Sequence, residues 1–154
     1  MADEQAAAQK FQVQRTYIKD SSFESPATPG IWQQNWKPQI KVDLNTRSGG
    51  VENNQAEVVL TVTITAKLED TVAYLVEIQQ AGLFTVEGFN AEQVQQILAI
   101  ACPNVLFPYA REAVDNLVLK GGFPALNLQP VNFEALYMQA RQQAADKSEA
   151  GTAH

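Results

Sequence analysis

The sequence predicts an α+β fold, a four-stranded antiparallel meander sheet with helices packed on one face. Apolar and polar residues alternate in four consecutive segments of the first half, which is the pattern of half-buried strands. In the second half, apolar residues recur every three or four positions, which places them on one helical face. Consecutive alternating strands favour a meander with one apolar side, and the helices supply its cover.

The clearest strand pattern spans residues 57–67, EVVLTVTITAK, where apolar residues face one way and three threonines the other. In the first predicted strand, Phe11, Val13 and Tyr17 share one face, which Arg15 interrupts. Because this strand lies at one end of the predicted meander, it is a candidate sheet edge, and two such edges could pair across a two-fold axis. The other predicted strands cover residues 11–18, 39–45 and 72–80.

Leu75 is an exception to the pattern of the fourth strand. It is an apolar residue on the predicted outer face, beside Glu77. A single exposed leucine is common in folded proteins and by itself indicates nothing. The buried face of this strand is predicted to consist of Val72, Tyr74, Val76 and Ile78.

Residues 19–38 contain three prolines and both tryptophans of the protein, so we expect an irregular but ordered loop. Long loops in compact domains are commonly functional. One interpretation is a small apolar core beneath the loop. The other is an adaptable apolar binding surface.

Local signals place the helix ends. Asn90 and Gln93 have the spacing of a capping box, which predicts a helix start there. A second helix is expected to begin near Pro103 and to end at Gly121-Gly122. Pro108 comes one turn later, so either the first turn is distorted there or the regular helix begins near it. An extended, proline-flanked crossing follows, and Asn132 caps a final helix.

We predict one domain at residues 11–143, with a disordered N-terminal tail at 1–10 and a disordered, solvated C-terminal tail at 144–154. The N-terminus carries acids where a signal peptide carries bases, and no stretch is long and apolar enough to span a membrane, so we expect a cytoplasmic protein. The net charge of −6 and the absence of clustered basic residues argue against nucleic acid as a partner.

The sequence offers little catalytic chemistry. The only histidine, His154, is the last residue, which disfavours histidine-based catalysis and most zinc sites. Cys102 stands at a predicted helix start and is expected to be a small buried apolar residue, although a helix N-terminus could activate it. No phosphate-binding or nucleophile motif occurs. Binding is therefore favoured over catalysis, with a carboxylate-dependent enzyme as the remaining catalytic alternative.

Four motifs carry a resemblance to the bacterial protein-export chaperone family SecB, and the resemblance extends along nearly the whole chain, from about Phe11 to Gln142. They are FQVQRTYIKD with the following SFE and proline, the strand EVVLTVTITA, ACPNVLFPYARE, and GGFPALNLQPVNFEALY. The resemblance implies a non-enzymatic homotetramer, a dimer of dimers, that uses neither ATP nor metal. It would hold precursor proteins unfolded and deliver them to the SecA translocase motor.

The resemblance also implies two sets of site residues. By their match to the family, the SecA-binding residues are expected to be Asp20, Glu24, Leu75 and Glu77. The exposed Leu75 then becomes the apolar centre of an acidic patch, which suits a basic partner. Unfolded clients need broad apolar surface rather than one shaped pocket. For that role we select Phe23, Ile31, Trp32, Trp36 and Tyr137, some of which could instead belong to the core.

An alternative function remains open at this point. A non-catalytic adaptor of the same fold would bind one dedicated folded partner and ignore unfolded chains. The two hypotheses differ in whether an unfolded client binds.

Overall fold

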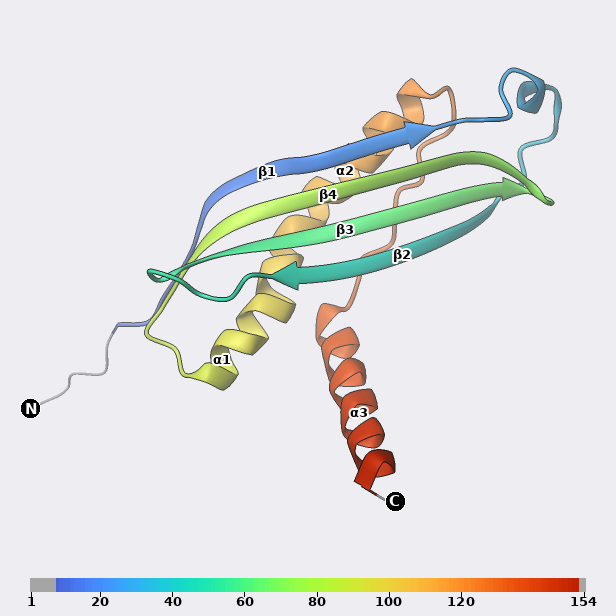
Figure 1. The fold of residues 1–154 in the computed structure, drawn as a ribbon. Helices are drawn as coiled ribbons and strands as arrows, with labels where there is room; N and C mark the ends of the chain where they lie inside the picture. The colour runs from blue at the N-terminus through green and yellow to red at the C-terminus, as the bar shows by residue number, and fades with distance from the viewer. Residues whose placement is uncertain (1–7, 153–154) are drawn as a thin grey trace, which may run out of the picture.

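The structure, a computed structural model, describes residues 8–152 and consists of a long curved sheet with a helical layer on one face (Figure 1). The predicted tail residues 1–7 lie outside the described residues. The elements in chain order are β1 (Lys10–Glu24), η1 (Gly30–Gln33), β2 (Gln39–Ser48), β3 (Gln55–Leu68), β4 (Thr71–Glu87), α1 (Ala91–Gln96), η2 (Ile97–Ala101), α2 (Cys102–Lys120) and α3 (Phe133–Thr152).

The four strands form one antiparallel sheet, but their order is β1-β4-β3-β2. The predicted meander is therefore correct for β2, β3 and β4 and wrong for β1. After β1, residues 25–38 cross the end of the sheet and lead to β2 at the opposite edge, as Figure 1 shows. β1 does occupy an edge, as the sequence predicts, but its neighbour is β4.

The β1–β4 pairing runs from Lys10 opposite Glu87 to Glu24 opposite Leu75, with two register shifts. The first shift falls between Val13 and Arg15. A bulge adds one residue and reverses which face the following side chains occupy. Phe11 therefore stacks on Phe84 on the helical side, whereas Tyr17 lies on the other side, where it hydrogen-bonds to Glu57. The predicted common face of Phe11, Val13 and Tyr17 is wrong for this reason.

The capping box at α1 is confirmed, because the Gln93 amide N–H donates to Asn90 Oδ1 and the Asn90 amide N–H donates to Gln93 Oε1. The second predicted helix does not begin separately. Instead α1 continues through the π-helical turn η2 into α2. Pro103 follows this turn and lacks an N–H group, so the wider turn lets the helix pass the proline without a regular α-helical bond there.

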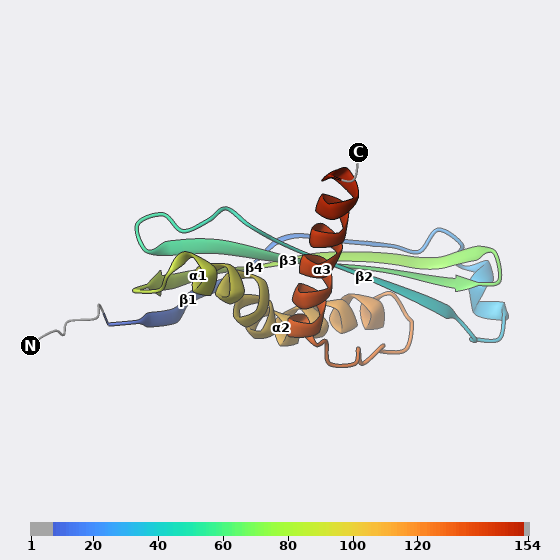
Figure 2. The same cartoon turned by 90° about the horizontal axis from the view of Figure 1, so that it is seen from below.

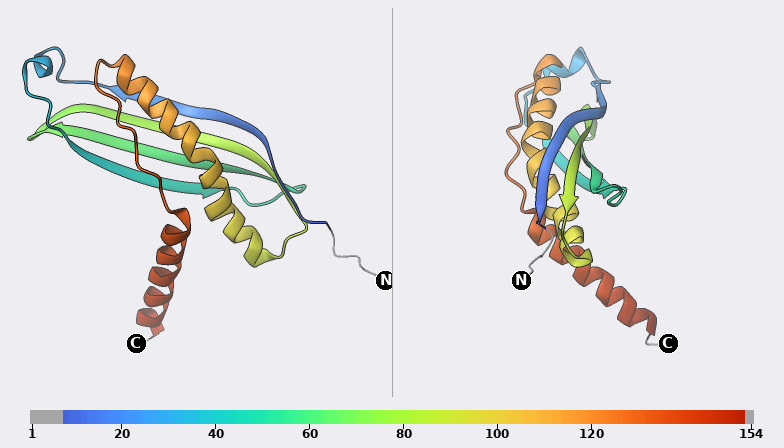
Figure 3. Two further views of the ribbon diagram at one scale, coloured as in Figure 1. Left: turned by 180° about the vertical axis from the view of Figure 1, so that it is seen from behind. Right: turned by 90° about the vertical axis from the view of Figure 1, so that its left-hand side faces the viewer.

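Gly121 follows α2, and Gly122 has the left-handed φ of +89° that ends the helix as predicted. Residues 123–132, which we call the crossover segment, return alongside α2 (Figure 3). Asn132 then caps α3, because its side-chain oxygen accepts the N–H of Ala135 at 2.9 Å. α3 projects from the body of the molecule and continues to Thr152 (Figures 1 and 3), so the segment predicted as a tail from residue 144 is helical over this length.

The main core lies between the sheet and α2, which packs on one face of the sheet (Figure 2). Side chains that alternate along β3 and β4 supply one half, and the inward face of α2 supplies the other. The fully buried members include Val58, Leu60, Val62, Ile64, Val76, Ile78, Phe84, Leu106, Ala110, Val114 and Val118. Among the described residues no helix is long and apolar enough to cross a membrane.

Candidate functional site

The outer face of the sheet, opposite α2, carries the first set of predicted site residues. In the β1–β4 register, Glu24 pairs with Leu75, and Ser22 pairs with Glu77. Asp20 pairs with Gln79, two residues further along β4. Residues paired across antiparallel strands project on the same face. Asp20, Glu24, Leu75 and Glu77 therefore share one surface, which we call the outer patch, and Leu75 is 37% exposed within it.

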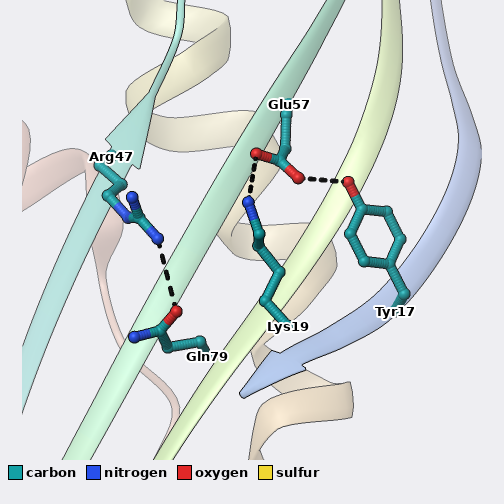
Figure 4. A network of polar contacts seen from close by, with 5 residues as sticks. All are labelled: Tyr17, Lys19, Arg47, Glu57 and Gln79. Carbon is teal, nitrogen blue, oxygen red and sulfur yellow. Dashed lines mark hydrogen bonds and ion pairs between the residues drawn. The ribbon is translucent and has the colours of Figure 1, made fainter.

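A polar network lies next to the outer patch on the same face (Figure 4). Tyr17 Oη donates a 2.5 Å hydrogen bond to Glu57 Oε2, and Lys19 Nζ binds Glu57 Oε1 at 3.0 Å. These two donors, the tyrosine first, lower the pKa of Glu57 below its usual value. Desolvation, with a contribution from Glu57, raises the pKa of Tyr17 to about 12.

The network gives the outer face an ordered charge pattern. Arg47 Nη2 donates to Gln79 Oε1 at 3.4 Å, so a second cation lies over the middle of the sheet. Beside this network, Val59 and Ala81 are buried although their positions in the register place them on the outer face. The acids of the outer patch therefore lie at the end of the sheet near Leu75. The cations Lys19 and Arg47 lie at the border of the patch that is further from Leu75.

A cluster of aromatic rings occupies the helical side of the same sheet end. Phe123 is its centre, with Trp32 at 4.6 Å, Tyr74 at 4.9 Å and Trp36 at 5.2 Å between ring centroids. Phe23 stacks on Tyr74 at 5.7 Å. Trp32 is 48% exposed, so the cluster is accessible at its rim. Three of the predicted client residues, Phe23, Trp32 and Trp36, thus converge here.

The other two predicted client residues do not join this cluster. Ile31 is only 3% exposed and belongs to the core, which is the alternative that the sequence left open. Tyr137 lies on α3, where it lines a separate small hollow with Arg47 and Leu98. The guanidinium of Arg141 stacks over the Tyr137 ring at 5.7 Å.

An open apolar groove, which the sequence analysis missed, extends along the β2 side of the helical layer. We call it the crossover groove, and its volume is about 710 Å³. Its lining comes from β2, α2, the crossover segment and the first turn of α3. The apolar lining comprises Ile40, Val42, Leu44, Phe107, Leu126, Leu128, Val131 and Leu136.

The sequence does hold a signal for this groove. Ile40 and Val42 alternate like core residues, yet they stay 38% and 42% exposed on the edge strand. Leu126 and Leu128 lie in an extended segment that has no strand partner among the described residues. Apolar residues on an edge strand and on an unpaired extended segment indicate a surface that is left to bind something.

Cys102 is buried in the core, and desolvation raises the pKa of its thiol to about 12. The thiol therefore stays protonated near neutral pH, and a protonated, buried thiol is a poor nucleophile. The helix N-terminus that could have activated it is absent, since α1 and η2 precede it without a break. Within residues 8–152 no cluster of three or more potential metal ligands occurs.

Comparisons with known proteins find relatives that match most of the chain. The family model for "Preprotein translocase subunit SecB" matches residues 4–144. The chain belongs to the SecB family. Protein-export protein SecB of Hahella chejuensis is 57% identical over 136 residues, which is 87% of this chain and 86% of that protein. SecB of Marinobacter nauticus is 52% identical over 147 residues, 91% of this chain and 89% of that protein.

A solved structure has the same SecB-like fold. It is a SecB-like chaperone of Mycobacterium tuberculosis in complex with a ChAD peptide from the HigA1 antitoxin, with a TM-score of 0.62 and 16% identity. The likeness covers 79% of this chain and 90% of that one, and it confirms the predicted α+β class. With SecB membership, the chain is a protein-export chaperone.

Proposed function

We propose that this SecB chain holds exported precursors in an unfolded state and passes them to SecA. The observation that carries the proposal is the separation of two surfaces on opposite sides of one sheet. The aromatic cluster and the crossover groove lie on the helical side, and the acidic outer patch lies on the other. A chaperone with this arrangement holds a client on one side while the motor binds the other.

The helical side has the properties that an unfolded client requires. Such clients differ in sequence, so their binding depends on apolar area and adaptable contacts rather than on one matched pocket. The crossover groove is open and apolar, and the aromatic cluster adds rings with exposed edges, such as Trp32. Of the residues selected from the sequence, we retain Phe23, Trp32 and Trp36 for client contact. Client contact by Tyr137 stays a prediction, and this residue lies on α3, apart from the aromatic cluster.

The outer patch has the properties of a surface for a basic partner. Its acids, Asp20, Glu24 and Glu77, surround the apolar Leu75. Charges at the rim of an interface mainly raise the association rate and fix the register, while a central apolar side chain supplies contact area. We assign this patch to SecA, as the family resemblance implies.

We further propose that the chain assembles as a dimer of dimers. β1 is an edge strand, and Val13 and Ile18 on it are exposed large apolar residues. An exposed edge with apolar side chains is an aggregation hazard unless another strand covers it. Pairing of two β1 edges across a two-fold axis would remove that hazard and bury these side chains. The proposed setting is the cytoplasm, and the proposed mode of action is non-catalytic, without ATP or metal.

Light scattering in line with size-exclusion chromatography tests the proposal. The protein is run alone and with an excess of a reduced, unfolded precursor, in the absence of nucleotide. The expected result is a mass near four subunits that rises when the precursor is added. A particle that ignores unfolded chains but binds a single folded protein would instead support the adaptor function.

A further inference from the structure

The carboxylate of Asp115 on α2 holds the middle of the crossover segment. Asp115 Oδ1 accepts the backbone N–H of Leu126 at 2.9 Å, and the N–H of Asn127 lies at 3.3 and 3.4 Å from the two carboxylate oxygens. One side chain thus binds two consecutive amides of a segment eleven residues further along the chain. Hydrogen bonds to an ionised acceptor are about twice as strong as those between neutral groups.

A second side chain from the same helix holds the next residue. Arg111 Nη1 donates to the carbonyl oxygen of Leu128 at 3.4 Å, and its guanidinium stacks over the Phe107 ring at 5.6 Å. Arg111 and Asp115 are four residues apart, so they lie on the same side of α2. Together they fasten three successive residues of the crossover segment to the helix. We call these contacts the strap.

The backbone between the strapped residues has an unusual conformation. Asn127 has a φ of +51°, which is the left-handed region that asparagine tolerates better than other residues with a side chain. This bend interrupts the extended segment at the point where Asp115 binds it. The strap therefore holds a conformation that the segment does not prefer by itself.

The strapped segment is one wall of the crossover groove. Leu126 and Leu128 flank the bend and line the groove, and they face Ile40 and Val42 of β2 across it. At its two ends the segment is anchored by buried rings, Phe123 in the aromatic cluster and Phe133 against Phe107 at 6.0 Å. Between these anchors, the polar contacts that hold the segment to α2 are those of Asp115 and Arg111 among the described residues.

We propose that Asp115, supported by Arg111, is a positioning residue that fixes the wall of the crossover groove and thereby sets its affinity for unfolded clients. The inference rests on the proposed client-holding function. Asp115 is not among the residues that line the crossover groove. It lines a neighbouring hollow with Glu112 and Asn116, and so acts on the groove through the crossover segment. When the strap is lost, the segment loses its fixed position, and a client must order it on binding.

The test compares the full-length Asp115→Ala variant with Glu112→Ala. Glu112 is an exposed acid on the same helix, and among the described residues its side chain makes no hydrogen bond to the crossover segment. Both variants lose one negative charge. Arg111→Ala serves as a second strap variant, and Asp115→Asn retains one acceptor oxygen. Hydrogen exchange at the Leu126 and Asn127 amides and affinity for a reduced, unfolded model protein are measured for each.

We expect Asp115→Ala to speed exchange at both amides by at least tenfold and to weaken client binding by about tenfold. The exchange rates and client affinity of Asp115→Asn should lie between those of Asp115→Ala and the wild type. Glu112→Ala should match the wild type in both measurements. Unchanged exchange in Asp115→Ala would overturn the strap. Faster exchange with unchanged client affinity would overturn the link to binding. If the wild type binds no unfolded client but Asp115→Ala speeds amide exchange as expected, the proposed function is wrong and the strap is still supported.

Should Asp115→Ala fail to fold, Asp115→Asn and Arg111→Ala carry the same test. Thermal unfolding and circular dichroism identify that case. A loss of client affinity in Glu112→Ala equal to that in Asp115→Ala would show that the charge of the helix, rather than the strap, is responsible, and would also overturn the inference.

Discussion

Thr63 and Glu77 face one another across the β3–β4 pair, and Thr63 Oγ1 donates a 2.8 Å hydrogen bond to Glu77 Oε1. The bond fixes one oxygen of the carboxylate close to Leu75 in the outer patch. Thr63 belongs to the threonine row of β3, so the donor to this acid is neutral, and among the described residues no cation forms an ion pair with Glu77. The negative charge is therefore kept available for a partner.

Glu77→Lys should weaken SecA binding by about tenfold at low salt and less at high salt, since it reverses a charge in the outer patch. Client holding should be unchanged, because the helical side is untouched. Titration of SecA at two salt concentrations and an aggregation assay with an unfolded client measure the two activities. Glu87→Lys, at the far end of the same strand, is the matched control. Equal loss of both activities would contradict the separation of the two surfaces.

Trp36→Ala should do the reverse. Trp36 contacts Phe123 and Tyr74 in the aromatic cluster, and its removal deletes a large apolar contact for the client. We expect client affinity to fall about fivefold to tenfold, with SecA binding retained. Tyr109→Ala, which removes an exposed ring from α2, is the control. If client affinity stays at the wild-type value, Trp36 serves the fold rather than the client.

Glu57 should make the stability of the protein pH-dependent at the acidic end. The hydrogen bond from Tyr17 and the contact with Lys19 lower its pKa in the folded state below the ordinary 4.5. A lowered pKa stabilises the fold above the ordinary value, and the contribution is lost as the pH falls through the folded value. Glu57→Gln should therefore cost under about 1 kcal/mol at pH 7, because the pair is partly exposed.

The difference in unfolding free energy between wild type and Glu57→Gln should be constant from pH 7 down to about pH 5 and shrink below that. Urea unfolding at several pH values measures it. A difference that grows on acidification would contradict the assignment. Tyr17→Phe should remove part of the same pH dependence, since its hydroxyl is the first of the two donors.

Tyr74→Phe should keep or raise stability. Its hydroxyl is buried and has no hydrogen-bond partner among the described residues, and burial raises its pKa to about 12. An unsatisfied buried hydroxyl costs about 1–3 kcal/mol, so its deletion should raise the unfolding free energy by about 1 kcal/mol. In the wild type, the raised pKa contributes stability that is present below pH 10 and is lost as the pH rises towards 12. The variant has no hydroxyl to titrate at this position, so it should resist alkaline unfolding in that range.

Thermal and urea unfolding at pH 7 and pH 11 measure these two effects for Tyr74→Phe. Tyr109→Phe, at an exposed tyrosine of α2, should change neither. A loss of more than about 1 kcal/mol in Tyr74→Phe would show that the hydroxyl has a partner that stabilises the fold.

Much of the local structure could be predicted from the sequence, because it depends on residues close together in the chain. The capping box at Asn90, the stop at Gly121-Gly122 and the cap at Asn132 are each made by side chains or backbone within a few residues. The SecB family was also predicted from motifs, and it is confirmed. The roles of individual site residues stay predictions.

The candidate site could be predicted only in part. Asp20, Glu24, Leu75 and Glu77 were selected by resemblance, and the register places them on one face. Ile31 was selected with the tryptophans because it is apolar and lies in the same loop, but the core covers it. Exposure of an apolar side chain depends on which other elements reach it, and that information is distant in the sequence.

The sequence by itself determined the family, the presence of four strands and the capped helix ends at Asn90, Gly121-Gly122 and Asn132, since alternation and caps are short-range properties. The strands are longer than predicted, and the first two predicted helices form one continuous helix. Only the tertiary structure decided that β1 pairs with β4, where the bulges reverse its faces, and that β2, α2 and the crossover segment enclose a groove. The physical reason is that an alternating strand has the same pattern whichever neighbour it pairs with. The choice between neighbours is made by the packing of the whole sheet against α2.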